Sequence, residues 1–184
     1  MARREVREKL SISRPHVLLG LKDTPGRGVK GRVRRRIEGV MLMEILFGDG
    51  GRIQAPLYRE GLVDDTLSAG YEAETDYAFA LVGAEVDAIE PYQRALLGAL
   101  RAAARDGLTE EEVERCRRRF LGRHLRVFNG PESCAHWMLA LALEGAEPGA
   151  GVDALRGATR VGLNRRLREL AKAPRAWSCV TPND

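Results

Sequence analysis

The stretch that decides the fold is APLYREGLVDDTLSAGYEAETDYAFALVGAE, residues 55–85. A short helical pattern and a turn, APLYREGLV, come first, and the runs TLSAGYEAE and YAFALVGAE follow. These runs alternate apolar and polar residues, which is typical of half-buried strands, and residues 74–76 separate them. The stretch therefore predicts an antiparallel hairpin with Tyr71, Tyr77 and Phe79 at strand positions. It contains no histidine, no cysteine and no nucleophile beside a base, so it predicts architecture rather than chemistry.

Toward the N-terminus, a strand, a loop and a helix are expected. PHVLLGLK, residues 15–22, is a short apolar run that ends at turn formers, as a buried strand does. Residues 23–31 form a loop, and apolar residues then recur every three or four positions as far as Gly48, which predicts a helix. Four arginines, at 32 and 34–36, crowd its first turns, where the helix dipole disfavours cations. We expect something else to compensate them, such as an acidic partner.

Toward the C-terminus, the pattern is helical until a last strand. Helices are expected over residues 88–107 and 109–127, the second opened by the capping box of Thr109 and Glu112. A third begins at Pro131 and runs to about Leu143, EGAEPGAG is a loop, a final helix lies within 155–173, and residues 175–181 form a strand. The chain is therefore predicted to be α+β, with two layers and helices covering a largely antiparallel sheet.

Composition places the chain among soluble globular proteins with one domain. It has 184 residues, 44% hydrophobic and 30% charged, with a net charge of +4. Residues 1–13 are predicted to be a charged N-terminal segment, and residues 14–184 the domain. Three irregularly spaced cysteines argue for a reducing compartment. The N-terminus lacks the apolar core of a signal peptide, and no apolar run reaches the ~20 residues of a membrane span. We expect a cytoplasmic protein without membrane contact.

The residues that could do chemistry are poorly spaced for it. Neither His-Glu-x-x-His nor His-x-x-Glu-His occurs. A zinc site from Cys116, His124, Cys134 and His136 is disfavoured, because the first two lie about 12 Å apart along a helix. A hydrolase that uses Cys134 or Ser133 with His136 would need a partner geometry that i+2 helical spacing does not give. We predict no catalytic residue, no metal ligand and no cofactor in this chain.

A basic binding module is the alternative function. Its cations would come from Arg27, Lys30, Arg32 and residues 34–36, and from the arginine face of residues 115–126. Such patches bind nucleic acid or an acidic partner through charge. No aromatic residues are interleaved for base stacking, so nucleic acid is the less favoured partner.

Three phrases of the chain resemble one protein family. They are LYREGLVDDTLSAGYEAETDYAFALVGAE, GLTEEEVERCRRRFLGRHLRVFNGPESCAHWM and PHVLLGLK. Over residues 14–180 the chain resembles the C-terminal-type domain of the peptidase M16 (insulinase, mitochondrial processing peptidase) family. More narrowly, it is similar to the bacterial M16-like proteins that come as paired zinc-protease homologues. The resemblance implies the α+β fold of M16 or LuxS-like metallohydrolase domains. It also implies an assembly that closes around a peptide, with zinc held in another domain.

The function implied by the resemblance is that of a catalytically inactive peptidase domain, the non-zinc part of that assembly. Its partner would be a zinc-bearing M16 domain or subunit, or a second copy, and a peptide is the implied substrate. The family uses an Arg and a Tyr seven residues later to hold substrate, but the resemblance places Leu57 and Asp64 there. Tyr58 and Tyr71 are expected to pack between the layers. The residues expected to contact substrate or partner are Tyr58, Arg59, Tyr71, Arg34 and Arg35.

Overall fold

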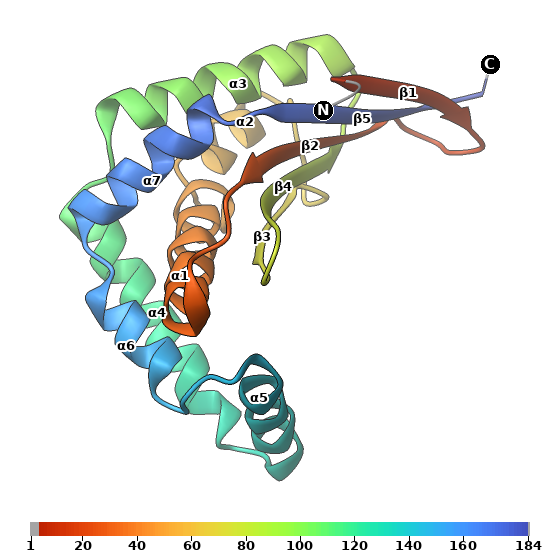
Figure 1. Ribbon diagram of the computed structural model, residues 1–184. Helices are drawn as coiled ribbons and strands as arrows, with labels where there is room; N and C mark the ends of the chain where they lie inside the picture. The colour runs from red at the N-terminus through yellow and green to blue at the C-terminus, as the bar shows by residue number, and fades with distance from the viewer. Residues whose placement is uncertain (1–3, 184) are drawn as a thin grey trace.

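A mixed sheet lies beside a layer of helices in the computed structural model, which describes residues 4–183 (Figure 1). Within these residues the sheet has five strands in the order β1-β5-β2-β4-β3, and the β1–β5 pair alone is parallel. The strands are β1 (Glu5–Leu10), β2 (His16–Asp23), β3 (Ser68–Ala73), β4 (Ala78–Glu85) and β5 (Arg175–Pro182). The predicted α+β class with a largely antiparallel sheet is confirmed.

The sheet buries one face and leaves the other largely open. Along β2 the buried residues are Val17, Leu19 and Leu21, which alternate with outward-facing neighbours such as Leu18. β4 shows the same alternation over its whole length. The predicted hairpin is confirmed, because β3 and β4 pair antiparallel across the turn at residues 74–77.

Seven helices are present in residues 4–183; they lie to one side of the sheet, and only some of them pack directly on its buried face (Figure 1). They are α1 (Gly28–Phe47), α2 (Gln54–Arg59), α3 (Ile89–Asp106), α4 (Glu110–Val127), α5 (Pro131–Glu144), α6 (Ala150–Gly157) and α7 (Arg160–Lys172). The capping box that opens α4 is present, and proline stands in the first turn of α5, both as predicted. α1 packs along β3 and forms the centre of the helical layer.

Two expectations about the elements were wrong. Residues 5–10 form β1, so the domain does not begin at residue 14; this strand exposes every residue and is bound to β5 through its backbone, and it therefore lacks a hydrophobic pattern. The final helix expected within residues 155–173 is present as α7, but the helix α6 before it was not expected, and its first two residues lie in the loop expected over residues 144–151. Thr159 separates the two helices, and its hydroxyl accepts a hydrogen bond from the Gly162 amide and caps α7.

α5 lies at the far end of the molecule from the sheet (Figure 1). None of its residues is fully buried, and the large side chains Met138, Leu139 and Leu143 are more than half exposed. Within residues 4–183, no helix is both long enough and apolar enough to cross a membrane.

Candidate functional site

The outer edge of β3 is the part of the sheet best suited to receive another chain. β3 is the last strand of the sheet, and among the described residues it pairs only with β4. Its inward side chains Tyr71 and Ala73 are buried, whereas Ser68, Gly70 and Glu72 are exposed. An edge strand presents a row of backbone N–H and C=O groups, which an extended peptide can pair with.

The hydrogen-bond pattern of the hairpin identifies the backbone groups at this edge. The amide of Glu74 donates to the carbonyl of Tyr77 at 2.8 Å, so these two residues form a hydrogen-bonded pair. Hydrogen-bonded and non-hydrogen-bonded pairs alternate along an antiparallel ladder, and the β3–β4 register is unbroken. Residues 68, 70 and 72 therefore bond to β4. The backbone groups of residues 69, 71 and 73 point away from β4, to the free edge.

The opposite edge of the sheet is better protected. β1 has the sequence EVREKL, with four charged residues in six. One of them, Arg7, is paired with Glu5 of the same strand and, at 2.8 Å, with Glu90 of α3. Charged side chains on an edge strand discourage the addition of another strand. β3 has Glu72 as its only charged residue, and its edge is accordingly the more receptive one.

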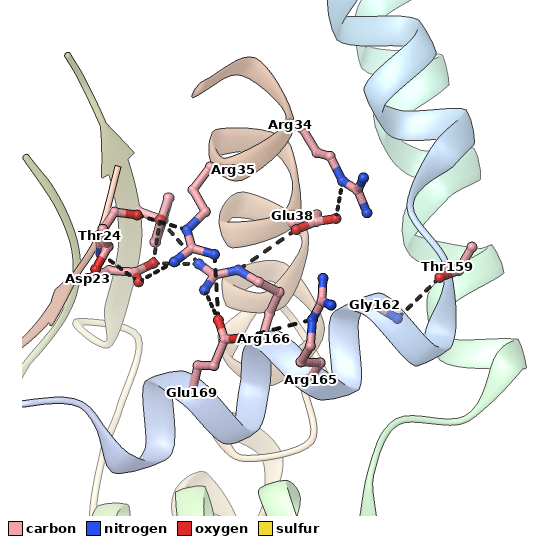
Figure 2. A network of polar contacts seen from close by, with 11 residues as sticks. Asp23, Thr24, Arg34, Arg35, Glu38, Thr159, Gly162, Arg165, Arg166 and Glu169 are labelled. Carbon is pink, nitrogen blue, oxygen red and sulfur yellow. Dashed lines mark hydrogen bonds and ion pairs between the residues drawn. The ribbon is translucent and has the colours of Figure 1, made fainter. Parts of the chain in front are cut away.

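A buried polar network fixes the helical layer to the sheet at the end of β2 (Figure 2). Its centre is Arg166 of α7, which is 1% exposed and forms ion pairs with Asp23, Glu38 and Glu169. The Tyr71 hydroxyl donates to Asp23 at 2.6 Å. β2, β3, α1 and α7 therefore meet at one cluster of charges.

The environment of this network shifts three pKa values. Burial raises the pKa of the Tyr71 phenol, and its hydrogen bond to Asp23 raises it further. Burial acts to raise the pKa of Asp23, but hydrogen bonds from Arg166 and Tyr71 outweigh it and lower that pKa. The pKa of Arg166 is raised: burial acts against the charged form, but the hydrogen bonds to Asp23 and Glu169 and the negative charge of Asp23 together outweigh it. Asp23 is thus an anion and Arg166 a cation at neutral pH.

The five predicted contact residues lie in different surroundings. Tyr71 is buried, so it packs between the layers as expected, but its side chain does not face solvent as a contact residue would. Tyr58, on α2, is 50% exposed; the expectation that it packs between layers was wrong, because the buried residue of this short helix is its neighbour Leu57. Arg59, also on α2, is exposed.

The two α1 arginines among the predicted contacts are ion-paired within the domain. Arg34 donates to Glu38 at 2.8 Å, and Arg35 donates to Asp23 at 3.0 Å. The contact roles of Tyr58, Arg59, Arg34 and Arg35 stay predictions.

The residues considered for catalysis are not organised as a catalytic group. Cys134 is partly exposed and Ser133 and His136 are exposed on α5, and the structure records no hydrogen bond between their side chains. Cys116 is buried, which raises the pKa of its thiol to about 12. Among residues 4–183, no group of three or more His, Cys, Asp or Glu side chains is arranged to hold a metal ion.

Several of the arginines considered for nucleic-acid binding are paired with carboxylates of the same domain. Besides Arg34 and Arg35, Arg36 binds both oxygens of Glu144, at 3.0 and 2.7 Å. On α4, Arg119 pairs with Glu44 at 2.7 Å. Such internal pairs leave less unbalanced charge for a phosphate backbone than the sequence indicates.

The chain is similar to known bacterial zinc-protease homologues. It is 31% identical over 136 residues to the uncharacterized zinc protease YmfH of Bacillus subtilis, an alignment that covers 73% of this chain and 31% of that protein. It matches the crystal structure of an M16-like peptidase from Alicyclobacillus acidocaldarius with a TM-score of 0.88 and 24% identity, over 99% of this chain and 44% of that one. No protein-family model matches the chain.

A further solved structure, the inactive peptidase domain of a zinc protease from Bordetella parapertussis, matches with a TM-score of 0.74 and 16% identity over 95% of both chains. These likenesses define the class of the chain as an M16-type peptidase domain. The chain belongs to the peptidase M16 family and has the fold in which inactive peptidase domains occur. It spans about a third of the Bacillus protein and less than half of the Alicyclobacillus one.

Sequence reasoning missed the centre of the polar network. Arg166 was not singled out among the many arginines, although it lies three residues after Leu163 and four before Leu170, on the apolar face of its helix. A charged residue at a core position of the helical period predicts a buried partner. Asp23 was read as the first residue of a loop, and its sequence neighbourhood gives no comparable signal.

The residues at the two positions where the family pattern has Arg and Tyr make contacts within the domain. Leu57 is buried in the core. Asp64 accepts hydrogen bonds from Arg14 at 2.6 Å and from the Thr66 hydroxyl at 2.6 Å, and these bonds lower its pKa.

Proposed function

We propose that this domain binds an extended peptide along the edge of β3 without cleaving it, as the non-zinc part of an M16 assembly. The observation that carries the proposal is the free edge of β3, with the backbone groups of residues 69, 71 and 73 facing outward. Main-chain hydrogen bonds to such an edge bind a peptide with little regard to its sequence. This suits a domain that holds varied chains.

The contacts that hold β3 in the strand conformation support this role. α1 packs along the strand, and Tyr71 is tied through Asp23 to the buried Arg166. An edge that is already held in the strand conformation loses little conformational entropy when a peptide pairs with it. The network of Figure 2 therefore holds the edge strand in the conformation that a peptide can pair with, although no side chain of the network lies at the edge itself.

The partner that we propose is a zinc-bearing M16 domain, on the same polypeptide or on another subunit. The Bacillus and Alicyclobacillus proteins both extend well beyond the part that this chain matches, so such proteins have room for further domains. Zinc would then be bound by the partner, and peptide cleavage would take place there. A cytoplasmic location belongs to the same proposal and is favoured by three cysteines that form no disulfide.

The test is peptide binding with and without one edge amide. A fluorescein-labelled, proline-free 15-residue peptide is titrated with the protein, and its anisotropy is followed. Ala69→Pro removes an N–H that points to the free edge and leaves the bonds to β4 in place, so we expect affinity to fall at least about tenfold, the effect of about 1.4 kcal/mol in hydrogen bonding. Ala69→Thr is the matched control, which changes the side chain and keeps the amide.

The peptide itself supplies a second control that does not depend on refolding of a variant. N-methylation of every central residue of the peptide blocks the amides on both of its edges, so this peptide should lose binding. Equal binding by wild type and Ala69→Pro, with no effect of the methylation, would show that the edge is not the site. Cleavage of the peptide by the domain alone, detected by mass spectrometry with zinc added, would contradict the non-catalytic role.

A further inference from the structure

A second site, unrelated to the edge of β3, lies between α5 and the rest of the helical layer. It is a half-open cavity of about 650 Å³ among α1, α4, α5 and α6, and the β3–β4 turn forms part of its rim. Its wall is mainly apolar, formed by Val33, Ile37, Phe120, Trp137, Leu141 and Leu155. Both the volume and the apolar lining are typical of small-ligand sites.

An aromatic cluster gives the α5 side of the cavity a defined shape. His124, Phe128 and Trp137 contact one another edge to face, with ring centroids 5.4 Å apart in each pair. Such contacts orient the rings as well as bury them. They also hold α5 against α4, and the indole of Trp137 is thereby kept in the wall of the cavity.

The charges of the cavity are balanced except at the rim. Arg36 is neutralised by its two bonds to Glu144, and Arg123 lies 3.4 Å from Glu44. Arg32, which is half-buried, has no hydrogen-bond or ion-pair partner within residues 4–183. A guanidinium beside an apolar wall, with no carboxylate to pair with, is a place where an anionic group of a ligand gains the most.

We propose that this cavity binds a monocarboxylate with an apolar tail, the tail against Trp137 and its apolar neighbours and the carboxylate on Arg32. The chemistry is shared by a medium-chain fatty acid and by a peptide chain that ends in apolar residues. The proposal does not depend on the function of the β3 edge, since the lining comes from other elements. Among the described residues that line the cavity, the one unpaired acidic side chain is Glu74, in the β3–β4 turn, and it opposes the binding of an anion.

The test uses the fluorescence of Trp137 while the whole protein is titrated with sodium octanoate and, separately, with 1-octanol. Octanoate should bind the tighter of the two. Arg32→Gln should weaken octanoate binding about tenfold, the usual strength of a charge-assisted hydrogen bond, and leave octanol unchanged. Glu74→Gln should tighten octanoate binding about twofold, because it removes a nearby like charge. Arg94→Gln, on the exposed face of α3, is the matched control and should change neither.

Different outcomes identify the source of the ligand or overturn the site. If acetyl-Leu-Leu binds tighter than both its amide and octanoate, the site is assigned to a peptide C-terminus. If octanoate binds tighter than acetyl-Leu-Leu, it is assigned to a free fatty acid. Equal binding of octanoate and octanol by the unmutated protein would overturn the proposal, and so would an effect of Arg32→Gln no larger than that of Arg94→Gln. Trp137→Phe should abolish the fluorescence response; a full response without Trp137 would place the ligand elsewhere.

Discussion

Replacing Arg166 by methionine should lower the free energy of unfolding by up to about 3–5 kcal/mol, the usual effect of removing one partner of a buried ion pair. The size follows from what the change leaves behind. Asp23 and Glu38 have side chains only 8% and 5% exposed, and both lie within ion-pair distance of the Arg166 guanidinium. Methionine fills much of the same volume, so the loss comes from the two carboxylates rather than from a cavity: they lose their buried cation and keep only Arg35 and Arg34 as ion-pair partners.

Urea unfolding followed by far-UV circular dichroism measures this loss directly. The midpoint should fall while the slope with urea stays constant, because the surface exposed on unfolding is nearly unchanged. The neighbouring Arg165→Met is the matched control. Its side chain is 66% exposed and lies 4.0 Å from Glu169, so its removal should cost less than about 0.5 kcal/mol.

The double variant Arg166→Met with Asp23→Asn tests whether the loss comes from the ion pair with Asp23 or from the removal of an arginine in general. The amide introduced by Asp23→Asn carries no charge, so no buried anion at this position loses an ion-pair partner when the arginine is removed. The double variant should therefore be at least about 1 kcal/mol more stable than the sum of the two single losses predicts. Additive losses would refute the reasoning, and so would an Arg166→Met variant as stable as Arg165→Met. The first result would mean that the pair with Asp23 does not account for the loss, and the second that Arg166 contributes through packing alone.

Two further predictions concern the same cluster. The folded pKa of Asp23 is lowered, so its contribution is present above the pKa of the unfolded chain, about 3.9, and is lost as pH falls through the folded value; unfolding titrations should show a shallower acid loss for Asp23→Asn than for wild type, and parallel curves would contradict this. Gly39→Ala should cost about 1–3 kcal/mol by thermal unfolding, because the added methyl would lie 2.2 Å from the Tyr71 ring; Gly98→Ala, on α3 with open space around it, is the control and should not destabilise.

Local pattern predicted the elements whose side chains alternate between core and solvent. β2, the hairpin and the capped helix α4 have a period or an end signal within a few residues, and they were found. β1 exposes all six residues and is held by backbone pairing to β5, at the other end of the chain, so no local signal marks it. The cavity and the β3 edge likewise depend on which elements become neighbours in the fold. The periodicity of apolar residues along the sequence does not show which elements are neighbours.

Resemblance supplied what periodicity could not for the family and the fold, but it gave less for the site. It led to Tyr71 as a contact residue, whereas the structure buries that side chain and leaves its backbone at the edge. Tyr58 shows the opposite error, since it was expected between the layers and is half exposed. Side-chain roles assigned from a family phrase therefore need the strand register and the burial of each position before they are tested.

The arginines at the start of α1 connect the separate parts of this molecule. They are placed unfavourably for the helix dipole, and the first turn has no acidic residue to offset them. Successive residues on a helix point in directions about 100° apart, and each arginine meets a different element. Arg34 binds Glu38 of its own helix, Arg35 binds Asp23 of β2, and Arg36 binds Glu144 of α5.

This arrangement answers the expectation that an acidic group compensates the cluster: for three of the four arginines, the group is a carboxylate of the same domain. The fourth, Arg32, lies one turn before Arg36 and therefore on the same helix face. Both line the cavity, but only Arg36 is neutralised there by a described residue. Among these four arginines, an acidic partner from outside the domain is therefore proposed at one position rather than at four. That position opens onto an apolar wall, which is why a small carboxylate with an apolar tail fits it better than a polyanion does.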